Sequence, residues 1–308
     1  MGLSEFDLIR QYFSQIGDSP SVRVAVGDDA AVLQLPEDHV QLISVDTAVS
    51  GVHFLPTMSA DVIAYRAIMT AASDLAAMGA KPEGMLLALT LPEAGGEWLA
   101  AFAEGARKAS LVTAMPLIGG DTTRGPLCVT VTVLGSAPAN RYLTRDGARP
   151  GDRLCVSGTL GDAAAGLSLI ENTDVSLSAE QAMFLQQRFT QPTARLALGQ
   201  TLSALATSAI DISDGLLADA GHLARASDVR LVIQRDAIPF SVALKAHPDQ
   251  NQVQEWVLRG GDDYELLFTL PPEAALPDDC TEIGLVVAGQ GVQCEGAGPM
   301  TGYDHFGH

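Results

Sequence analysis

Two acidic stretches decide the fold, VAVGDDAAVL at residues 24–33 and LISVDTAVSGVH at residues 42–53. Each is a short apolar run typical of a buried strand, and each stops at carboxylates. Two such strands side by side would present Asp28, Asp29, Ser44, Asp46 and Thr47 at neighbouring ends. Oxygen ligands of this kind hold Mg²⁺ in proteins. The two stretches therefore predict a sheet with an acidic, metal-binding edge.

The same pattern recurs, which argues against a simple polar turn. LIGGDTT at residues 117–123 and AIDISDG at 209–215 are again apolar runs that end in Gly or Ser with Asp. Asp74 lies near the end of the helix predicted to begin at Asp61. Together these motifs place six carboxylates at the ends of predicted strands or helices: Asp28 or Asp29, Asp46, Asp74, Asp121, Asp211 and Asp214. Clustered hard ligands suit two or more Mg²⁺ ions and phosphoryl transfer, in which positioning and charge neutralisation do most of the catalytic work.

Composition narrows the class of partner. The 308 residues carry 37 acids against 18 Lys and Arg, a formal charge of -19, which repels nucleic acid and anionic membranes. Such a surface accepts a polyphosphate only if divalent cations lie between the two sets of oxygens. No apolar run is long enough to span a bilayer, and the four cysteines form no CxxC pair, so we expect a cytoplasmic protein with reduced thiols.

Strands and helices interleave along the whole chain, which predicts an α/β or α+β fold. Pro, Gly and charge cluster between residues 137 and 152, so we place a domain boundary there and expect domains at 1–138 and 150–308. The predicted helices cover residues 4–13, 61–78, 97–111, 163–170 and 216–226, and the predicted strands cover 81–92, 127–135 and 153–157.

Several residues have two interpretations on the sequence alone. Glycines before the helix at 163 suit either phosphate contact or capping by Asp162. Asp74 near a helix C-terminus is either a surface side chain or a functional one, because the helix dipole disfavours it there. Arg124 and Arg145 suit either a phosphate or the surface. His222 fits a surface or core position better than a ligand.

Eight motifs in order give the chain a resemblance to the thiamine-monophosphate kinase family, in the superfamily that includes aminoimidazole ribonucleotide synthetase. They are GDDAAV at 27–32, SVDTAVSGVHF at 44–54, SDLAAMGA at 73–80, IGGDTTRG at 118–125, LTRDGARPGD at 143–152, DISDGL at 211–216, GGDDYEL at 260–266 and GYDHF at 302–306. The resemblance implies a two-domain fold, with an N-terminal sheet domain that forms a homodimer and a C-terminal α/β domain. It also implies ATP-dependent phosphorylation of thiamine monophosphate to thiamine diphosphate with Mg²⁺.

The resemblance also implies a role for each matching residue. The magnesium ligands would be Asp29, Ser44, Asp46, Asp74, Asp121, Asp211 and Asp214, with Val45 able to contribute only its backbone carbonyl. Gly120, Asp121, Arg145 and Ser213 would contact ATP, and His53, Asp262 and Tyr303 would contact thiamine monophosphate. The family usually has Glu where this chain has Asp262, which shortens the reach by one methylene.

The residue chemistry agrees with these roles. Thiamine carries a cationic thiazolium ring, for which an acid and an aromatic face are suitable neighbours. The nucleophile would be a phosphate oxygen, already largely ionised at neutral pH, so no protein general base is required.

Two of four alternatives stay open at the sequence level. Aminoimidazole ribonucleotide synthetase is the nearest enzyme alternative. Selenophosphate synthetase would need an N-terminal Cys, whereas the first here is Cys128, and the hydrogenase-maturation member ends in Cys, whereas this chain ends in His308. A non-catalytic metal-binding or nucleotide-sensing protein is the alternative from another class.

Overall fold

The computed structural model describes residues 5–93, 95–171 and 177–296. The chain divides into two compact units, the first within Met1–Leu75 and Ala80–Tyr142 and the second within Ala76–Gly79 and Leu143–His308. In the described part of the chain, no helix combines the length and the apolar character that crossing a membrane requires.

The first unit is built around a four-stranded sheet. Its elements are α1 (Glu5–Leu8), a π-helical turn (Ile9–Phe13), β1 (Val22–Val24), β2 (Val32–Leu33), β3 (His39–Val49), α2 (Ala60–Ala77), β4 (Lys81–Leu91), α3 (Gly96–Thr113), β5 (Leu117–Arg124) and β6 (Cys128–Pro138). The strand order is β3-β6-β4-β5, in which only the β4–β5 pair is parallel. The short strands β1 and β2 form a separate antiparallel ribbon.

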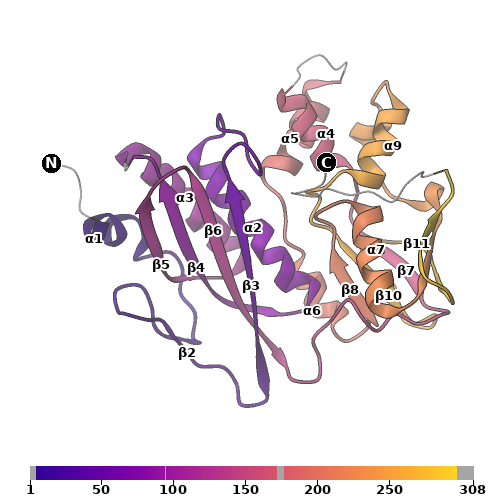
Figure 1. Ribbon diagram of the computed structural model, residues 1–308, viewed down its shortest axis with the longest axis horizontal. Helices are drawn as coiled ribbons and strands as arrows, with labels where there is room; N and C mark the ends of the chain where they lie inside the picture. The colour runs from indigo at the N-terminus through magenta and orange to yellow at the C-terminus, as the bar shows by residue number, and fades with distance from the viewer. Residues whose placement is uncertain (1–4, 94, 172–176, 297–308) are drawn as a thin grey trace. The chain divides into compact units, whose positions relative to one another are not determined.

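The two faces of this sheet differ in what covers them. Helices α2 and α3 lie behind the four strands in Figure 1. Val129, Val131 and Val133 of β6 are buried on that face, in alternation with half-buried side chains on the other. On β3, Ile43 is 62% exposed and Val45 59% exposed. The face away from the helices therefore presents apolar side chains to solvent.

The second unit is a six-stranded mixed sheet with helices around it. Its elements are β7 (Arg153–Ser157), α4 (Asp162–Glu171), α5 (Ala179–Thr190), α6 (Leu196–Leu202), β8 (Ser208–Asp211), α7 (Leu216–Ser227), β9 (Arg230–Ile233), a 3-10 turn (Arg235–Ala237), α8 (Val242–Lys245), α9 (Gln250–Arg259), β10 (Leu266–Leu270), β11 (Cys280–Val287) and β12 (Gly291–Cys294). The strand order is β12-β9-β11-β7-β10-β8, with one parallel pair, β12–β9. Every residue of β10 and β8 is buried, which explains the largely apolar sequence LLFTL of β10.

The predicted α/β class and most predicted elements are confirmed, but two expectations about the acidic stretches are wrong. Residues 24–33 are not one strand beside β3, because they contain the end of β1 and the whole of β2, which pair with each other in a separate ribbon, and β3 is an edge strand that pairs with β6. Asp46 and Asp121 do not stand at strand ends either; both lie inside strands, β3 and β5. The eleven residues of β6 pair with β3 on both sides of Asp46, so the strand continues through this acid.

Candidate active site

Ser44, Asp46 and Asp74 form the first acidic group, on the helix-covered face of the first unit. Ser44 and Asp46 are two residues apart on β3, so their side chains point to the same face. Asp74 is on α2, and the Ser44 hydroxyl donates a hydrogen bond of 2.5 Å to its Oδ2. The functional interpretation of Asp74 is therefore favoured over the surface one, because α2 turns this acid toward the sheet.

The electrostatics of this group favour a bound cation. Burial, and then the nearby charge of Asp74, raise the pKa of Asp46 from its ordinary value of 3.8 to about 6. Both causes penalise the ionised carboxylate. A divalent cation between Asp46 and Asp74 would remove the repulsion, and the hydroxyl of Ser44 adds a third oxygen ligand.

This shift predicts a pH-dependent stability difference in protein freed of divalent cations. A carboxyl whose folded pKa is raised contributes stability that is present below about pH 4 and is lost as the pH rises through about 6. We expect Asp46→Asn to unfold about 2–4 °C above the wild type at pH 7.5 and at the same temperature at pH 4, since the penalty is on the order of 1 kcal/mol after solvent screening.

Thermal unfolding in the presence of a chelator measures this difference. Asp236→Asn, which replaces an exposed acid in a 3-10 turn, is the matched control. A difference between wild type and Asp46→Asn that does not change with pH would contradict the raised pKa.

A second acidic group lines a cavity of about 890 Å³ in the same unit, formed in part by the 26–31 segment and β5. Asp28, Asp29 and Asp121 line it, together with Gly120. Gly120 is required there, because a Cβ at this position would lie 2.0 Å from the Leu87 carbonyl oxygen. The cavity brings together the predicted ATP contacts Gly120 and Asp121 and the predicted metal ligand Asp29.

The two acidic groups belong to opposite edges and opposite faces of the sheet. Strand β3 is one edge and β5 the other, with β6 and β4 between them, so about 14 Å separates the two backbones. The register aligns Asp46 with Gly120 through Val131 and Leu87. Asp121 is one residue further along β5 and therefore faces the other side of the sheet. Within one chain, Asp46 and Asp121 cannot ligate the same ion.

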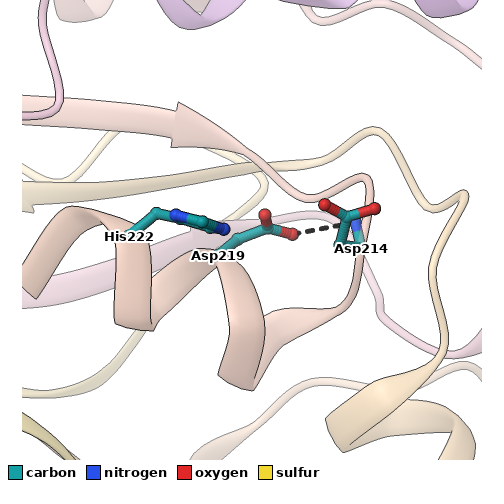
Figure 2. Close-up of side chains that lie close together, drawn as sticks. All are labelled: Asp214, Asp219 and His222. Carbon is teal, nitrogen blue, oxygen red and sulfur yellow. Dashed lines mark hydrogen bonds between the residues drawn. The ribbon is translucent and has the colours of Figure 1, made fainter. Parts of the chain in front are cut away.

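The second unit brings the DISDG motif together with two residues that the predicted site lacks. Ligand atoms of Asp214, Asp219 and His222 all lie within 4.8 Å of one another, and Figure 2 shows the three side chains together at the start of α7. The Asp219 carboxylate also accepts the backbone N–H groups of Ser213 and Asp214, both at 3.1 Å. His222 thus lies closer to the acids than the sequence indicated.

Burial is the larger cause that raises the pKa of Asp219 to about 8, and the charges of Asp211 and Asp214 add to it. Asp211 itself is buried, at the end of β8. The sequence contains a signal that connects Asp219 and His222. They are three residues apart in the first turns of a predicted helix and therefore share a face with each other.

The GGDD segment is hydrogen-bonded to the DISDG segment. The N–H of Asp262 donates to the Ser213 carbonyl at 2.9 Å, and the N–H of Tyr264 donates to the Ile212 carbonyl at 2.9 Å. Gly261 permits this approach, since a Cβ there would lie 2.3 Å from the Ser213 carbonyl oxygen. Backbone hydrogen bonding therefore holds Ser213, a predicted ATP contact, beside Asp262, a predicted contact of thiamine monophosphate.

The turn before α4 does not have the phosphate-binding or Asp162-capping role expected of it. The N–H groups of Gly161 and Ala163 donate to the Asp263 carboxylate, at 2.6 and 3.2 Å. Burial raises the pKa of Asp263 to about 8, against the opposing effect of these amides. Asp162 instead accepts the Thr159 hydroxyl at 2.5 Å. A buried internal acid, distant in sequence, already occupies the donors that a phosphate would use.

The remaining predicted residues make other contacts or lie outside the described residues. The Nδ1 of His53 accepts the Val49 N–H at 3.0 Å, which fixes the ring beside the end of β3. Arg145 is exposed, and its carbonyl accepts the Ser227 hydroxyl. Val45 points to the open face of the sheet. Tyr303 lies outside the described residues.

Comparison with known proteins gives consistent matches over nearly the whole chain. The model of AIR synthase related protein, N-terminal domain, matches residues 27–137, and that of the C-terminal domain matches 149–296. Thiamine-monophosphate kinase of Salmonella typhimurium is 42% identical over 322 residues, which cover 99% of each chain.

Two solved structures are also similar over most of their length. Thiamine-monophosphate kinase from Stenotrophomonas maltophilia has a TM-score of 0.83 and 39% identity, over 90% of this chain and 92% of that one. A structure described as AaThiL complexed with AMPPCP and TMP has a TM-score of 0.82 and 36% identity, over 92% of each chain.

Proposed function

Because this chain belongs to the thiamine-monophosphate kinases, a family of AIR synthase related proteins, we propose that it transfers the γ-phosphoryl group of ATP directly to thiamine monophosphate, with several Mg²⁺ ions between the reactants, as a cytoplasmic homodimer. It is a phosphotransferase with a phosphate group as acceptor. Its fold is the predicted two-domain type, with an N-terminal sheet domain and a C-terminal α/β domain.

The observation that carries the metal proposal is the Ser44–Asp46–Asp74 group. The carboxylates of Asp46 and Asp74 repel each other, and the hydroxyl of Ser44 lies beside them. This arrangement suits a divalent cation, which would remove the repulsion. Mg²⁺ bound there would neutralise the phosphate charge that the acidic surface repels. Asp29 and Asp121 would add ligands from the cavity group, Asp211 and Asp214 from the second unit, and Val45 its carbonyl.

The related structure with AMPPCP, an ATP analogue, and TMP supports the choice of reactants. In this chain Gly120, Asp121, Arg145 and Ser213 would contact ATP, and His53, Asp262 and Tyr303 would contact thiamine monophosphate. The acceptor is a phosphate oxygen that is already ionised at neutral pH, so the chain needs no general base. We infer in-line displacement without a phosphoenzyme, and a phosphorylated protein trapped after incubation with ATP alone would contradict it.

The open face of the four-stranded sheet supports the homodimer. Ile43 and Val45 project from it beside Thr132 and Leu134 of β6, their partners in the register. A second copy placed on this face would remove exposed apolar surface from water, which stabilises an association.

The dimer also resolves the separation of the two acidic groups. A second copy on the open face can bring its Asp121 edge to the Asp46 edge of the first, which a single sheet keeps about 14 Å apart. We therefore propose that Ser44, Asp46 and Asp74 of one copy act with Asp121 of the other.

A coupled assay of ADP release tests the activity. Thiamine monophosphate should stimulate ADP release from MgATP, whereas the substrate of aminoimidazole ribonucleotide synthetase should not. The reverse preference would favour that synthetase. Binding of ATP and Mg²⁺ without any stimulated ADP release would favour a non-catalytic sensor.

A further inference from the structure

The segment that contains Asp262 holds an aspartate and a tyrosine in left-handed backbone. The φ angle is +69° at Asp262 and +52° at Tyr264. Residues with a Cβ rarely adopt this conformation, whereas glycine does so without steric cost. The segment begins with two glycines, Gly260 and Gly261, yet the left-handed positions 262 and 264 carry side chains. Backbone strain at positions that carry side chains indicates a functional role for those side chains.

Contacts on the inner side of the segment fix its course. Asp263 is buried and accepts the amides at the start of α4. Glu265, 1% exposed, accepts Arg195 Nε at 2.6 Å, Arg188 Nη2 at 2.9 Å and the Ser157 hydroxyl at 2.5 Å. The amide bonds to Asp263 and the charge-assisted bonds from the two arginines to Glu265 hold both residues inward.

Asp262 and Tyr264 alternate with these two buried acids and are themselves half-buried. Their backbone N–H groups are bonded to the carbonyls of Ser213 and Ile212, both at 2.9 Å. The pair is therefore presented on a fixed frame, with both side chains partly accessible.

The Tyr264 hydroxyl donates a hydrogen bond of 2.9 Å to Oδ1 of Asp262. We propose that Tyr264 is a positioning residue for substrate recognition, which holds the Asp262 carboxylate in the rotamer that meets the cationic thiamine moiety. The inference rests on the proposed function, because it takes Asp262 as a contact of thiamine monophosphate. A carboxylate can accept several hydrogen bonds, so the bond from Tyr264 does not use its whole capacity as an acceptor.

The short side chain of Asp262 makes this restraint useful. An aspartate reaches one methylene less far than the glutamate usual in the family, so its contact depends more strongly on a single orientation. The hydrogen bond from Tyr264 already restricts the rotamers of Asp262 in the free protein. Less side-chain entropy is therefore lost when the ligand binds.

Tyr264→Phe removes only the hydroxyl. The Michaelis constant for thiamine monophosphate should rise about three- to tenfold, the range expected when one restrained side chain is freed, while kcat and the Michaelis constant for ATP stay within about twofold. Tyr142→Phe makes the same chemical change at an exposed residue and should match the wild type. An unchanged Michaelis constant for thiamine monophosphate, or an equal fall in kcat, overturns the proposal.

A double-mutant cycle separates positioning from direct contact. In an Asp262→Ala background, Tyr264→Phe should have no further effect on the affinity for thiamine monophosphate measured by calorimetry with AMPPCP and Mg²⁺. Additive effects would mean that the hydroxyl acts on the ligand itself, which overturns the inference. Failure of the proposed function is distinguishable, because the wild type would then release no ADP on addition of thiamine monophosphate.

Discussion

Asp46→Asn is expected to lower the rate of ADP release with thiamine monophosphate by about a thousandfold or more, which corresponds to about 4 kcal/mol of transition-state stabilisation. The asparagine keeps the size of the side chain but removes the charge next to Asp74. A cation site with one carboxylate fewer should hold its ions weakly, and the reacting phosphates would lose their neutralising partner. The steady-state rate at saturating MgATP and thiamine monophosphate measures the effect.

Two controls isolate the charge of Asp46. Asp236→Asn, at an exposed position, should keep full activity. Thermal unfolding should show that Asp46→Asn is folded, since the substitution removes an electrostatic penalty from the metal-free protein. Activity within about tenfold of the wild type in a folded variant would remove Asp46 from the metal site.

The second large effect is recovery of activity from two inactive variants. Asp46→Asn and Asp121→Asn, each inactive alone, should regain about one quarter of wild-type activity after mixing under conditions that allow subunit exchange. Random pairing makes about half of the dimers mixed, and each mixed dimer has one site with both acids intact. The basis is the sheet, which places these acids on opposite edges and faces of each copy.

Matched mixtures show whether the recovery comes from a shared site. Asp46 and Asp74 belong to the same group, so Asp46→Asn mixed with Asp74→Asn should recover no activity. Adding Ile43→Lys to both members of the first pair places a charge on the open sheet face, which should prevent pairing and recovery. No recovery from Asp46→Asn with Asp121→Asn, despite proven exchange, would contradict the shared site.

The sequence predicted the regular elements well where one periodicity extended over a full element. The helix expected at residues 61–78 is α2, at Ala60–Ala77, and the strand expected at 153–157 is β7, with the same bounds. The periodicity predicts that Asp74 lies near the end of its helix, which α2 confirms, but only the fold shows that it faces Ser44.

Other features depended on partners that lie far away in the sequence. The acids of β3 and β5 looked like strand ends because charge interrupts an apolar run, yet backbone pairing with β6 and β4 carries both strands through these motifs. The cap on α4 comes from Asp263, a hundred residues further along the chain than Ala163, which local pattern cannot indicate. The strand order that separates Asp46 from Asp121 is likewise a property of the sheet alone.

The dependence of thiamine-monophosphate-stimulated ADP release on Mg²⁺ tests the central claim most directly. A chain with a formal charge of -19 that holds two anionic reactants through its aspartates should release no ADP in excess chelator. Added Mg²⁺ should restore full activity in the wild type, and Asp46→Asn should need much higher Mg²⁺ or stay inactive. Turnover that persists when all divalent cations are chelated would contradict the account.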